Sequence, residues 1–336
     1  MIPKRCGGGG PPWSRNAGHV NLLPRQAPAI IKIPPATRAL PAVMSLPDDW
    51  VSLSSPQLGA AINPQGAQLS VLRDARGTDL LWNGDPAVWS GRAPLLFPIV
   101  GTLAGGNYRL GSRTYQLPRH GFARNRRFQV LSTSPARAVF RLVADAETLS
   151  VYPFRFELDV EFALAGPSLT LTTTVRNVGE EEMPASLGYH PAFLWPLPYG
   201  QPRSAHGIEF ATDEPDPVRR LDGAGLLSEE RIPTPIAGRR LALRDELFGN
   251  DALILDQVRS REVIYGAPEG PRLRVGFPDS PYLGIWSKPG AGFVCIEPWR
   301  GIADPQGFSG DFRSKPGVFI VPPAAAKAMQ MTIALT

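Results

Sequence analysis

The stretch FRFELDVEFALAGPSLTLTTTV (residues 154–175) decides the fold class, because apolar and polar residues alternate along two consecutive runs. In residues 154–164 every even-numbered position is Phe, Leu or Val, and four of the five odd-numbered positions are charged. Residues 168–175 repeat the alternation with threonines on the polar side. The Ala-Gly-Pro between the runs is typical of a turn. We therefore predict a long antiparallel hairpin with one buried face.

The same period of two recurs along most of the chain after residue 60. The further predicted strands are 67–73, 127–132, 138–144, 262–265, 272–277, 282–287, 293–296, 317–321 and 329–335. The 37 prolines interrupt any longer helical pattern. Many strands with short Gly/Pro turns predict an all-β protein, a large sandwich or barrel that forms one domain.

The first 45 residues differ in composition from the rest. They are rich in Pro and Gly, they lack acidic residues, and they carry six Lys or Arg. We predict a disordered basic extension (1–45), with Met44 as a candidate true start, ahead of a domain that spans 46–336. Without those six residues the formal net charge of +5 becomes −1. The domain thus has no basic excess for nucleic acid.

Composition also bears on membranes, metals and compartment. No run of 18 apolar residues predicts a membrane span. The two cysteines, Cys6 and Cys295, cannot form a disulfide framework or supply a zinc site alone. We predict a reduced, cytoplasmic protein without a metal or other cofactor. The sequence gives no indication of an oligomeric state.

Two of the four histidines lie in unusual surroundings. His120 is followed by a glycine and stands among arginines, which fits either a ligand-binding loop or a solvated basic loop. His190 precedes Pro191, which favours extended backbone and a well-aimed side chain. It fits either a core histidine bonded to the backbone or a proton donor. Its aromatic neighbours predict a sugar-stacking wall formed by Tyr189, Phe193 and Trp195.

Glu297 follows the apolar run FVCI (293–296) and precedes Pro298 and Trp299. A carboxylate at the end of a buried strand is costly unless it is paired or used in chemistry. A salt bridge to Arg300 is the structural alternative. The flanking proline and tryptophan favour a functional acid.

Four stretches, in this order, resemble segments of the aldose 1-epimerase (galactose mutarotase) family, and most closely its LacX-like branch. They are PLLFPIVGTLAGGNY (94–108), HGFAR (120–124), GYHPAF (188–193) and IEPW (296–299). The resemblance runs from about residue 50 to the end of the chain. It implies a large antiparallel β-supersandwich and an isomerase that interconverts the α and β anomers of a hexose without a metal or nucleotide.

The resemblance also implies roles for single residues. His190 matches the general acid that protonates the ring oxygen, and Glu297 matches the general base that takes the proton of the anomeric hydroxyl. His120, Arg92 and Asp251 match groups that bind sugar oxygens. For this chemistry we expect an ionised carboxylate beside a protonated histidine, since each favours the charged form of the other.

Three alternatives stay open. A hexose-6-phosphate 1-epimerase would use basic side chains at the mouth of the site, for which Arg124, Arg126 and Arg127 are candidates. A non-catalytic carbohydrate-binding or sensor protein would keep the fold and the sugar site alone. A β-sandwich interaction module would need neither. The predicted partner is a small-molecule sugar, not nucleic acid or a membrane.

Overall fold

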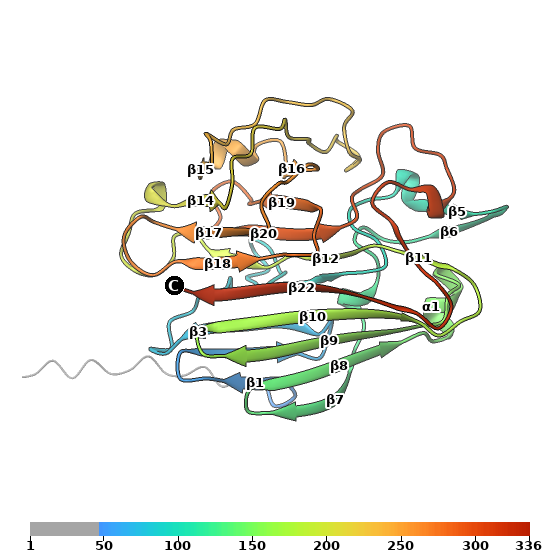
Figure 1. Ribbon diagram of the computed structural model, residues 1–336, viewed down its shortest axis with the longest axis horizontal. Helices are drawn as coiled ribbons and strands as arrows, with labels where there is room; N and C mark the ends of the chain where they lie inside the picture. Colours follow the sequence, from blue (N-terminus) through green and yellow to red (C-terminus); the bar gives the residue numbers. More distant parts are fainter. Residues whose placement is uncertain (1–46) are drawn as a thin grey trace, which may run out of the picture. The chain divides into compact units, whose positions relative to one another are not determined.

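The computed structural model describes residues 47–336, whose regular structure is almost entirely antiparallel β-strand (Figure 1). The one α-helix among these residues, α1 (Ala146–Val151), has six residues and is capped by Asp145. No helix in this part of the chain is long and apolar enough to cross a membrane. The predicted extension of residues 1–45, with Met44, lies outside the described residues. The shortage of helix confirms the all-β prediction.

The predicted hairpin forms from β9 (Phe156–Ala165) and β10 (Ser168–Asn177). Their register runs from Phe156 opposite Asn177 to Ala165 opposite Ser168. Even-numbered residues of β9 and odd-numbered residues of β10 point into the core, as the alternation predicts. The first strand begins at Phe156, two residues later than the alternation begins.

The hairpin lies inside a sheet of nine antiparallel strands, and Figure 1 shows its long strands β22, β10, β9 and β8 side by side. In order across the sheet, the strands are β15 (Arg240–Ala242), β14 (Gly207–Phe210), β17 (Glu262–Gly266), β18 (Leu273–Gly276), β22 (Ala326–Leu335), β10, β9, β8 (Arg137–Val143) and β7 (Gln129–Ser134). The outer face of β9 carries the predicted charges. Glu161 and Asp159 there pair with Arg137 and Arg141 of β8 at 2.7 and 2.6 Å.

A second sheet has six strands and contains Glu297. The strands are β16 (Leu253–Leu255), β19 (Tyr282–Trp286), β20 (Phe293–Arg300), β12 (Leu187–Tyr189) and β4 (Leu95–Leu96) in that order, with β13 (Ala192–Leu194) paired to β20. The hydroxyl of Tyr189 donates to Met329 O of β22 (2.8 Å) and accepts from Thr173 N of β10 (3.1 Å). These two hydrogen bonds of Tyr189 join the two sheets, which pack face to face across one continuous apolar core.

Smaller elements complete the described chain. They are the sheet β1 (Val51–Ser54), β2 (Leu58–Asn63) and β3 (Gln68–Asp74), the pair β5 (Asn107–Leu110) and β6 (Arg113–Gln116), the pair β11 (Met183–Ala185) and β21 (Phe319–Val321), and the 3₁₀ turns η1 (Ala104–Gly106), η2 (Ala123–Asn125), η3 (Arg203–Ala205), η4 (Asp245–Phe248) and η5 (Phe312–Ser314). The arrangement is the large antiparallel β-sandwich that the sequence predicts.

Candidate active site

Glu297 lies on β20 of the six-stranded sheet, and His190 faces it from the two-residue link between β12 and β13. β12 and β13 both pair with β20, on either side of His190 and Pro191. Gly188 lies opposite Trp299, and Ala192 lies opposite Cys295. The same register, carried across the gap, sets His190 opposite Glu297. Pro191 O, which accepts from Ile296 N at 3.3 Å, keeps the two chains aligned there.

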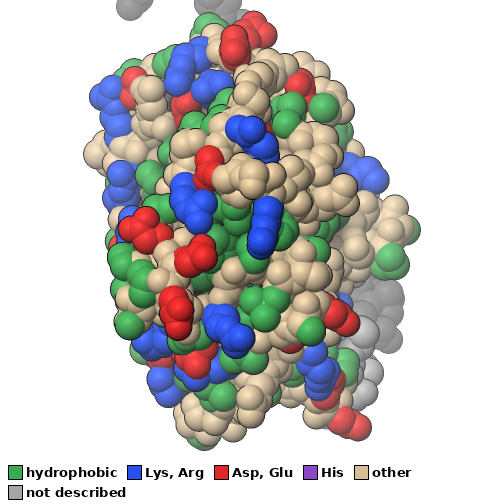
Figure 2. All heavy atoms as spheres, turned by 90° about the vertical axis from the view of Figure 1, so that its right-hand side faces the viewer, with side chains coloured by type: hydrophobic (Ala, Val, Ile, Leu, Met, Phe, Trp, Pro, Cys, Tyr) green, Lys and Arg blue, Asp and Glu red, His purple; other side chains and the backbone are tan. Residues whose placement is uncertain are grey.

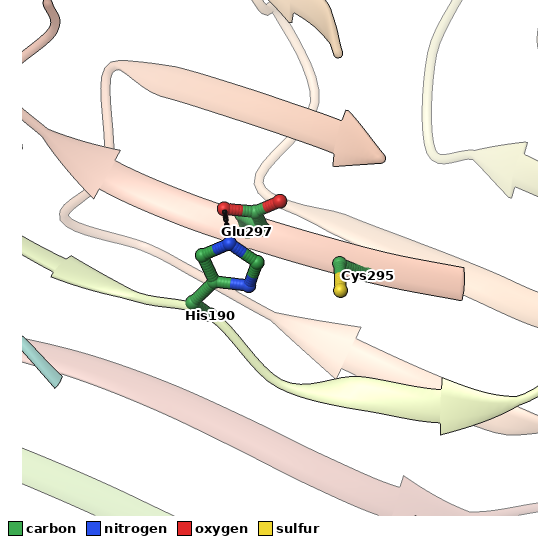
Figure 3. Close-up of side chains that lie close together, drawn as sticks. All are labelled: His190, Cys295 and Glu297. Carbon is green, nitrogen blue, oxygen red and sulfur yellow. Dashed lines mark ion pairs between the residues drawn. The ribbon is translucent and has the colours of Figure 1, made fainter. Parts of the chain in front are cut away.

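The two side chains touch. His190 Nε2 lies 3.1 Å from Glu297 Oε2, and the side chains are 10 % and 2 % exposed (Figure 3). Glu297 lies inside β20 rather than after its end, so the predicted strand boundary at residue 296 is wrong. The strand continues because Pro298 and Trp299 keep their pairing with Leu283 and Tyr282 of β19. The structural alternative, a salt bridge of Glu297 to Arg300, does not form among the described residues, where Glu297 pairs with His190.

Burial sets the protonation of this pair. It lowers the pKa of His190 to about 3, and nearby Arg119 and Arg124 act in the same direction. It raises the pKa of the Glu297 carboxyl well above its usual value, although the charge of Arg119 opposes this. Both shifts favour the uncharged forms, opposite to the ion pair expected from the sequence. A neutral histidine beside a protonated glutamate holds the same number of protons as that ion pair. One proton transfer along the 3.1 Å contact interconverts them.

His120 lies on a loop in which two consecutive residues have a positive φ. Its φ is +67° and that of Gly121 is +71°. A Cβ on Gly121 would lie 2.2 Å from Phe97 O, so glycine is required there. The loop holds the His120 ring 5.8 Å from the His190 ring, edge to face.

Main-chain contacts fix the tautomer of His120. Its backbone N donates to Gly101 O at 2.9 Å, and Gly101 N donates to its Nδ1 at 3.1 Å. Burial lowers the pKa of His120 well below the usual value, so the ring is neutral and its proton is on Nε2. Arg119 Nε lies 3.2 Å from this nitrogen. Since both groups carry a hydrogen, both are suited to donate to a ligand oxygen rather than to each other.

These groups line one cavity of about 270 Å³. Its aromatic walls are Trp89, Trp286 and Trp299. The Trp89 ring stacks on His190 with centroids 5.2 Å apart, and Trp286 meets the same imidazole edge-on at 5.9 Å. A mainly apolar cavity with flat aromatic walls and a few polar groups suits a sugar ring, which has apolar faces and a polar rim.

Of the residues predicted from the sequence, His120, Arg124, His190, Asp251 and Glu297 all line this cavity. Asp251 adopts a positive φ of +62°, and its Oδ2 lies 3.9 Å from Arg119 Nη2. The fold thus brings these five residues from distant parts of the chain to one cavity, as a catalytic site requires.

Tyr189, Phe193 and Arg92 do not line the cavity. Tyr189 and Phe193 are odd-numbered neighbours of His190 on extended backbone, so they point to the opposite face of the sheet. Tyr189 there joins the two sheets, and Phe193 is fully buried against Tyr265. Trp195 shares this parity and is 1 % exposed in the core. The wall predicted from these three aromatics is therefore wrong.

Arg92 is held elsewhere by its own contacts. Its Nη1 donates to Ser70 O at 2.7 Å, and its guanidinium lies 5.5 Å from the centre of the Trp50 ring. Arg92 therefore lies apart from the cavity, although the sequence placed it among the groups that bind sugar oxygens.

Sequence reasoning did not assign Arg119, Trp89 and Trp286 to the site. For Trp286 the sequence does contain a signal. It lies two residues after Gly284 on β19, so both lie on the same face of the sheet, and Gly284 lies opposite Glu297. Arg119 adjoins His120 in the chain. Trp89 lies on a loop without periodic pattern, and only the tertiary fold brings it to His190.

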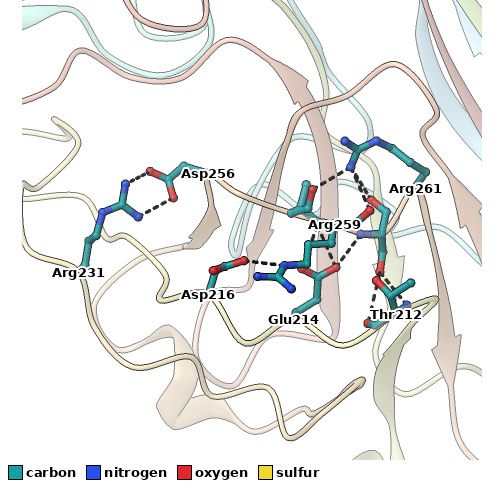
Figure 4. A network of polar contacts seen from close by, with 9 residues as sticks. Thr212, Glu214, Asp216, Arg231, Asp256, Arg259 and Arg261 are labelled. Atoms are coloured by element: carbon teal, nitrogen blue, oxygen red, sulfur yellow. Dashed lines mark hydrogen bonds and ion pairs between the residues drawn. The ribbon is translucent and has the colours of Figure 1, made fainter.

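Asp256, which lies close in the chain to one wall of the cavity, forms an ion pair with Arg231 (Figure 4). Asp256 lies 9 % exposed between Arg219 and Arg231, at 3.2 and 2.9 Å. Arg219 and Ile254 exchange both backbone hydrogen bonds. Ile254 and Leu221 line the cavity, so this network fixes the position of the apolar wall.

The surface shows no single-sign region in the view of Figure 2, where basic and acidic side chains are interspersed over the face. The exclusion of nucleic acid stays a prediction from charge.

Comparison with known proteins identifies the family. Residues 49–311 match the model of the aldose 1-epimerase family. The chain is 33 % identical over 295 residues to the LacX protein of Lactococcus lactis subsp. lactis, which covers 84 % of this chain and 99 % of that protein. The crystal structure of a galactose mutarotase related enzyme from Lactobacillus acidophilus is 30 % identical, with a TM-score of 0.78, over 85 % of this chain and 97 % of that one.

A galactose mutarotase-like protein from Lactobacillus casei ATCC 334 is 29 % identical, with a TM-score of 0.79, over 85 % of this chain and all of that one. These matches span almost the whole length of each relative, and the family match over residues 49–311 includes His120, His190 and Glu297. This chain belongs to the aldose 1-epimerase family.

Proposed function

We propose that this protein is an aldose 1-epimerase that interconverts the α and β anomers of a hexose. Glu297 is the general base for the anomeric hydroxyl, and His190 is the general acid for the ring oxygen. The observation that carries the proposal is their 3.1 Å contact on the floor of the cavity. An acid and a base so close can serve the two oxygens that share the anomeric carbon.

The proposed reaction moves two protons in each direction. Glu297 removes the proton from O1, the bond from C1 to the ring oxygen breaks as the aldehyde forms, and His190 protonates the released oxygen. After rotation about C1–C2, the reverse transfers close the ring on the other face. The reactive form is the ion pair, which the neutral pair reaches by one internal proton transfer.

His120 Nε2 and Arg119 are the proposed donors to sugar oxygens. Hydrogen bonds from a bound sugar and from these donors favour the ion pair over the neutral pair, because they replace the solvation that burial removes. Trp89 and Trp286 limit the access of water to the imidazole.

The direct test is polarimetry of freshly dissolved α-glucose and α-galactose with the full chain. We expect the protein to accelerate the approach to anomeric equilibrium in proportion to its concentration. Sugar binding in a calorimeter without any such acceleration would instead support the non-catalytic carbohydrate-binding alternative.

The pKa shifts predict an unusually broad pH profile. The pair holds its single exchangeable proton between the lowered pKa of His190, about 3, and the raised pKa of Glu297. Because the pKa of His190 is lowered, the acid limb of the rate profile moves to lower pH. Because the pKa of Glu297 is raised, the alkaline limb moves to higher pH. We expect kcat/KM to show no acid limb centred on the ordinary histidine pKa of about 6.5. A steep rise centred near pH 6.5 would contradict these assignments.

A hexose-6-phosphate 1-epimerase is the second candidate, and the two arginines of the cavity favour it. Among residues 47–336 Arg119 has one carboxylate partner, at 3.9 Å, and Arg124 Nη2 donates to the carbonyl of Arg119. Arg126 and Arg127 instead pair with Glu147 and Asp49 and do not line the cavity. Assays with glucose and glucose 6-phosphate at equal concentration decide between the candidates. The phosphorylated substrate would be favoured by a higher kcat/KM for glucose 6-phosphate than for glucose, together with a reversal of this preference in the Arg124→Gln variant.

The prediction of a reduced, cytoplasmic setting continues to rest on the cysteine count.

A further inference from the structure

The indole N–H of Trp299 lies in the buried region beside the proposed base. Trp299 stands two residues after Glu297 on β20, so both side chains point to the same face of the sheet. The residue lines the cavity and is 6 % exposed, but its Nε1 is buried and makes no hydrogen bond of ordinary length and angle among the described residues. Buried donors without an acceptor are rare in folded proteins, so we expect this N–H to find a partner in some state of the site.

Two glycines of the neighbouring strands leave room for the indole. Gly188 of β12 lies opposite Trp299. Gly284 of β19 lies opposite Glu297. A Cβ on Gly284 would lie 2.4 Å from Cζ2 and Cη2 of the indole, and a Cβ on Gly188 would lie 2.8 Å from its Cδ1. Since Nε1 lies between Cδ1 and Cζ2 along that edge of the ring, the two glycines hold the N–H edge of the indole down on the sheet.

The carboxyl of Glu297 is the group that this N–H acts on. Its Oε2 lies 3.1 Å from His190 Nε2, and Figure 3 shows its other oxygen directed away from the imidazole. Burial raises the pKa of this carboxyl well above its usual value. Arg119 lowers this pKa, Asp251 raises it, and a hydrogen bond from Trp299 lowers it. The indole is therefore near enough to favour the ionised form of Glu297, although the contact falls outside ordinary hydrogen-bond geometry.

We propose that Trp299 is a positioning residue for the proposed reaction, whose indole N–H donates a hydrogen bond to Glu297 when that carboxyl ionises. Hydrogen bonds to a charged acceptor are shorter and roughly twice as strong as those to a neutral one. The N–H therefore stabilises the carboxylate more than the carboxyl, and it favours the reactive ion pair over the neutral pair. Trp299 keeps its own proton while one proton passes from Glu297 to His190.

The place of the donor suits this role better than direct contact with a sugar. Because Nε1 is buried, a sugar in the cavity meets the carbon atoms of the ring and not its N–H. A donor that has no full hydrogen bond to the neutral carboxyl loses none when that carboxyl ionises. It is also fixed before the charge develops, which is the arrangement that stabilises charge most in a buried site.

Other charged and titratable groups also face Glu297 or Trp299. They are His190 from the link between β12 and β13, Arg119, His120 and Asp251 from loops that line the cavity, Cys295 on β20, and Tyr282 on β19 opposite Trp299. A test of the N–H must leave all of these groups in place.

The matched variants Trp299→Phe and Trp299→His meet this condition. Both remove the fused six-membered ring of the indole, so both open the same space beside Glu297. Only histidine keeps a ring nitrogen, Nε2, at the position of the indole Nε1. The difference between the two variants therefore isolates the donor from the bulk of the side chain.

The pKa of Glu297 is the direct readout, and it does not rest on the proposed function. Difference infrared spectroscopy of the full-length protein, with Glu297→Gln as the reference, follows the carbonyl stretch of the protonated carboxyl as the pH rises. Loss of a donor to the charged form raises a carboxyl pKa. We therefore expect a pKa at least about one unit higher in Trp299→Phe than in Trp299→His, a tenfold change in the ionisation constant.

Two further variants and one control accompany this measurement. Gly284→Ala keeps the indole but displaces its edge with a Cβ, so we expect its carboxyl pKa to exceed that of the wild type. Trp50→Phe makes the same exchange of indole for phenyl at a partly exposed residue that does not line the cavity, and we expect no change. Thermal unfolding verifies that each variant is folded.

The effect on the rate rests on the proposed function and is measured separately by polarimetry of α-glucose. We expect kcat to be about 10- to 100-fold lower in Trp299→Phe than in Trp299→His, the usual contribution of one hydrogen bond to a charged group, with similar KM. The alkaline limb of the rate profile should lie at higher pH in Trp299→Phe. A tryptophan that only forms part of the wall predicts equal losses in both variants.

Equal carboxyl pKa values in the two variants, or a carboxyl that stays protonated in both up to the pH of unfolding, would overturn the proposal. Mutarotation by the wild type together with that result would leave the proposed function standing. A higher pKa in Trp299→Phe in a protein without mutarotation would do the reverse, because it would support the hydrogen bond and contradict the proposed function.

Discussion

Glu297→Gln is expected to lower the catalysed rate of mutarotation by about 10²–10⁴-fold, the usual contribution of a general base. The amide keeps the shape of the side chain and its place opposite His190, but it cannot take the proton from the anomeric hydroxyl. The buried site tolerates this change because burial already favours an uncharged group at residue 297. Polarimetry at saturating sugar, with circular dichroism to verify folding, measures the effect.

The matched control is Glu161→Gln on the outer face of β9. It removes a carboxylate that pairs with Arg137 far from the cavity lining. We expect its rate to equal that of the wild type. A Glu297→Gln variant that keeps at least half of the wild-type rate would remove Glu297 from the role of base.

His190→Asn is expected to cause a loss of similar size, about 10²–10⁴-fold, because asparagine has no group that gives up a proton near neutral pH. Its shorter side chain also withdraws from Glu297, and the carboxyl then loses its 3.1 Å partner. Polarimetry under the same conditions measures the loss.

Tyr189→Phe is the control, one residue away on the opposite face. It removes the hydroxyl that bonds Met329 O, so we expect a loss of about 1 kcal/mol in the free energy of unfolding. We expect no change in rate. Wild-type activity in His190→Asn, or a large loss in Tyr189→Phe, would show that the parity argument misplaces the site.

The fold class could be predicted because the decisive strands are long and have one solvent-facing side. β9 and β10 alternate over ten residues each, so the pattern reports both the strand and its buried face. Short strands that are buried on both faces carry no such pattern. β16 reads Leu-Ile-Leu, and nothing in those three letters distinguishes it from a core segment of another kind.

The candidate site was predictable to the extent that its residues are chemically unusual in the sequence. His190 and Glu297 stood out as polar groups in apolar runs, each next to a proline. Their partnership depends on the register of β20 with β12 and β13, which is a long-range property. The aromatic wall failed for a simpler reason, because adjacent residues on extended backbone point to opposite faces. Applied to GYHPAF, that rule removes Tyr189 and Phe193 from the face of His190.

The ionisation of the pair needed the structure for a different reason. From sequence the mutual attraction of a histidine and a glutamate is visible, but the depth of their burial is not. With Glu297 2 % exposed, desolvation exceeds that attraction and favours the neutral pair.

The central claim is that His190 and Glu297 act as one proton-transfer unit. The most direct test is the mutarotation rate of the double variant His190→Asn/Glu297→Gln beside the two single variants. Groups that act as a unit are not additive, so the double variant should lose no more than the worse single variant. Losses that multiply, or single variants that retain the wild-type rate, would contradict the claim.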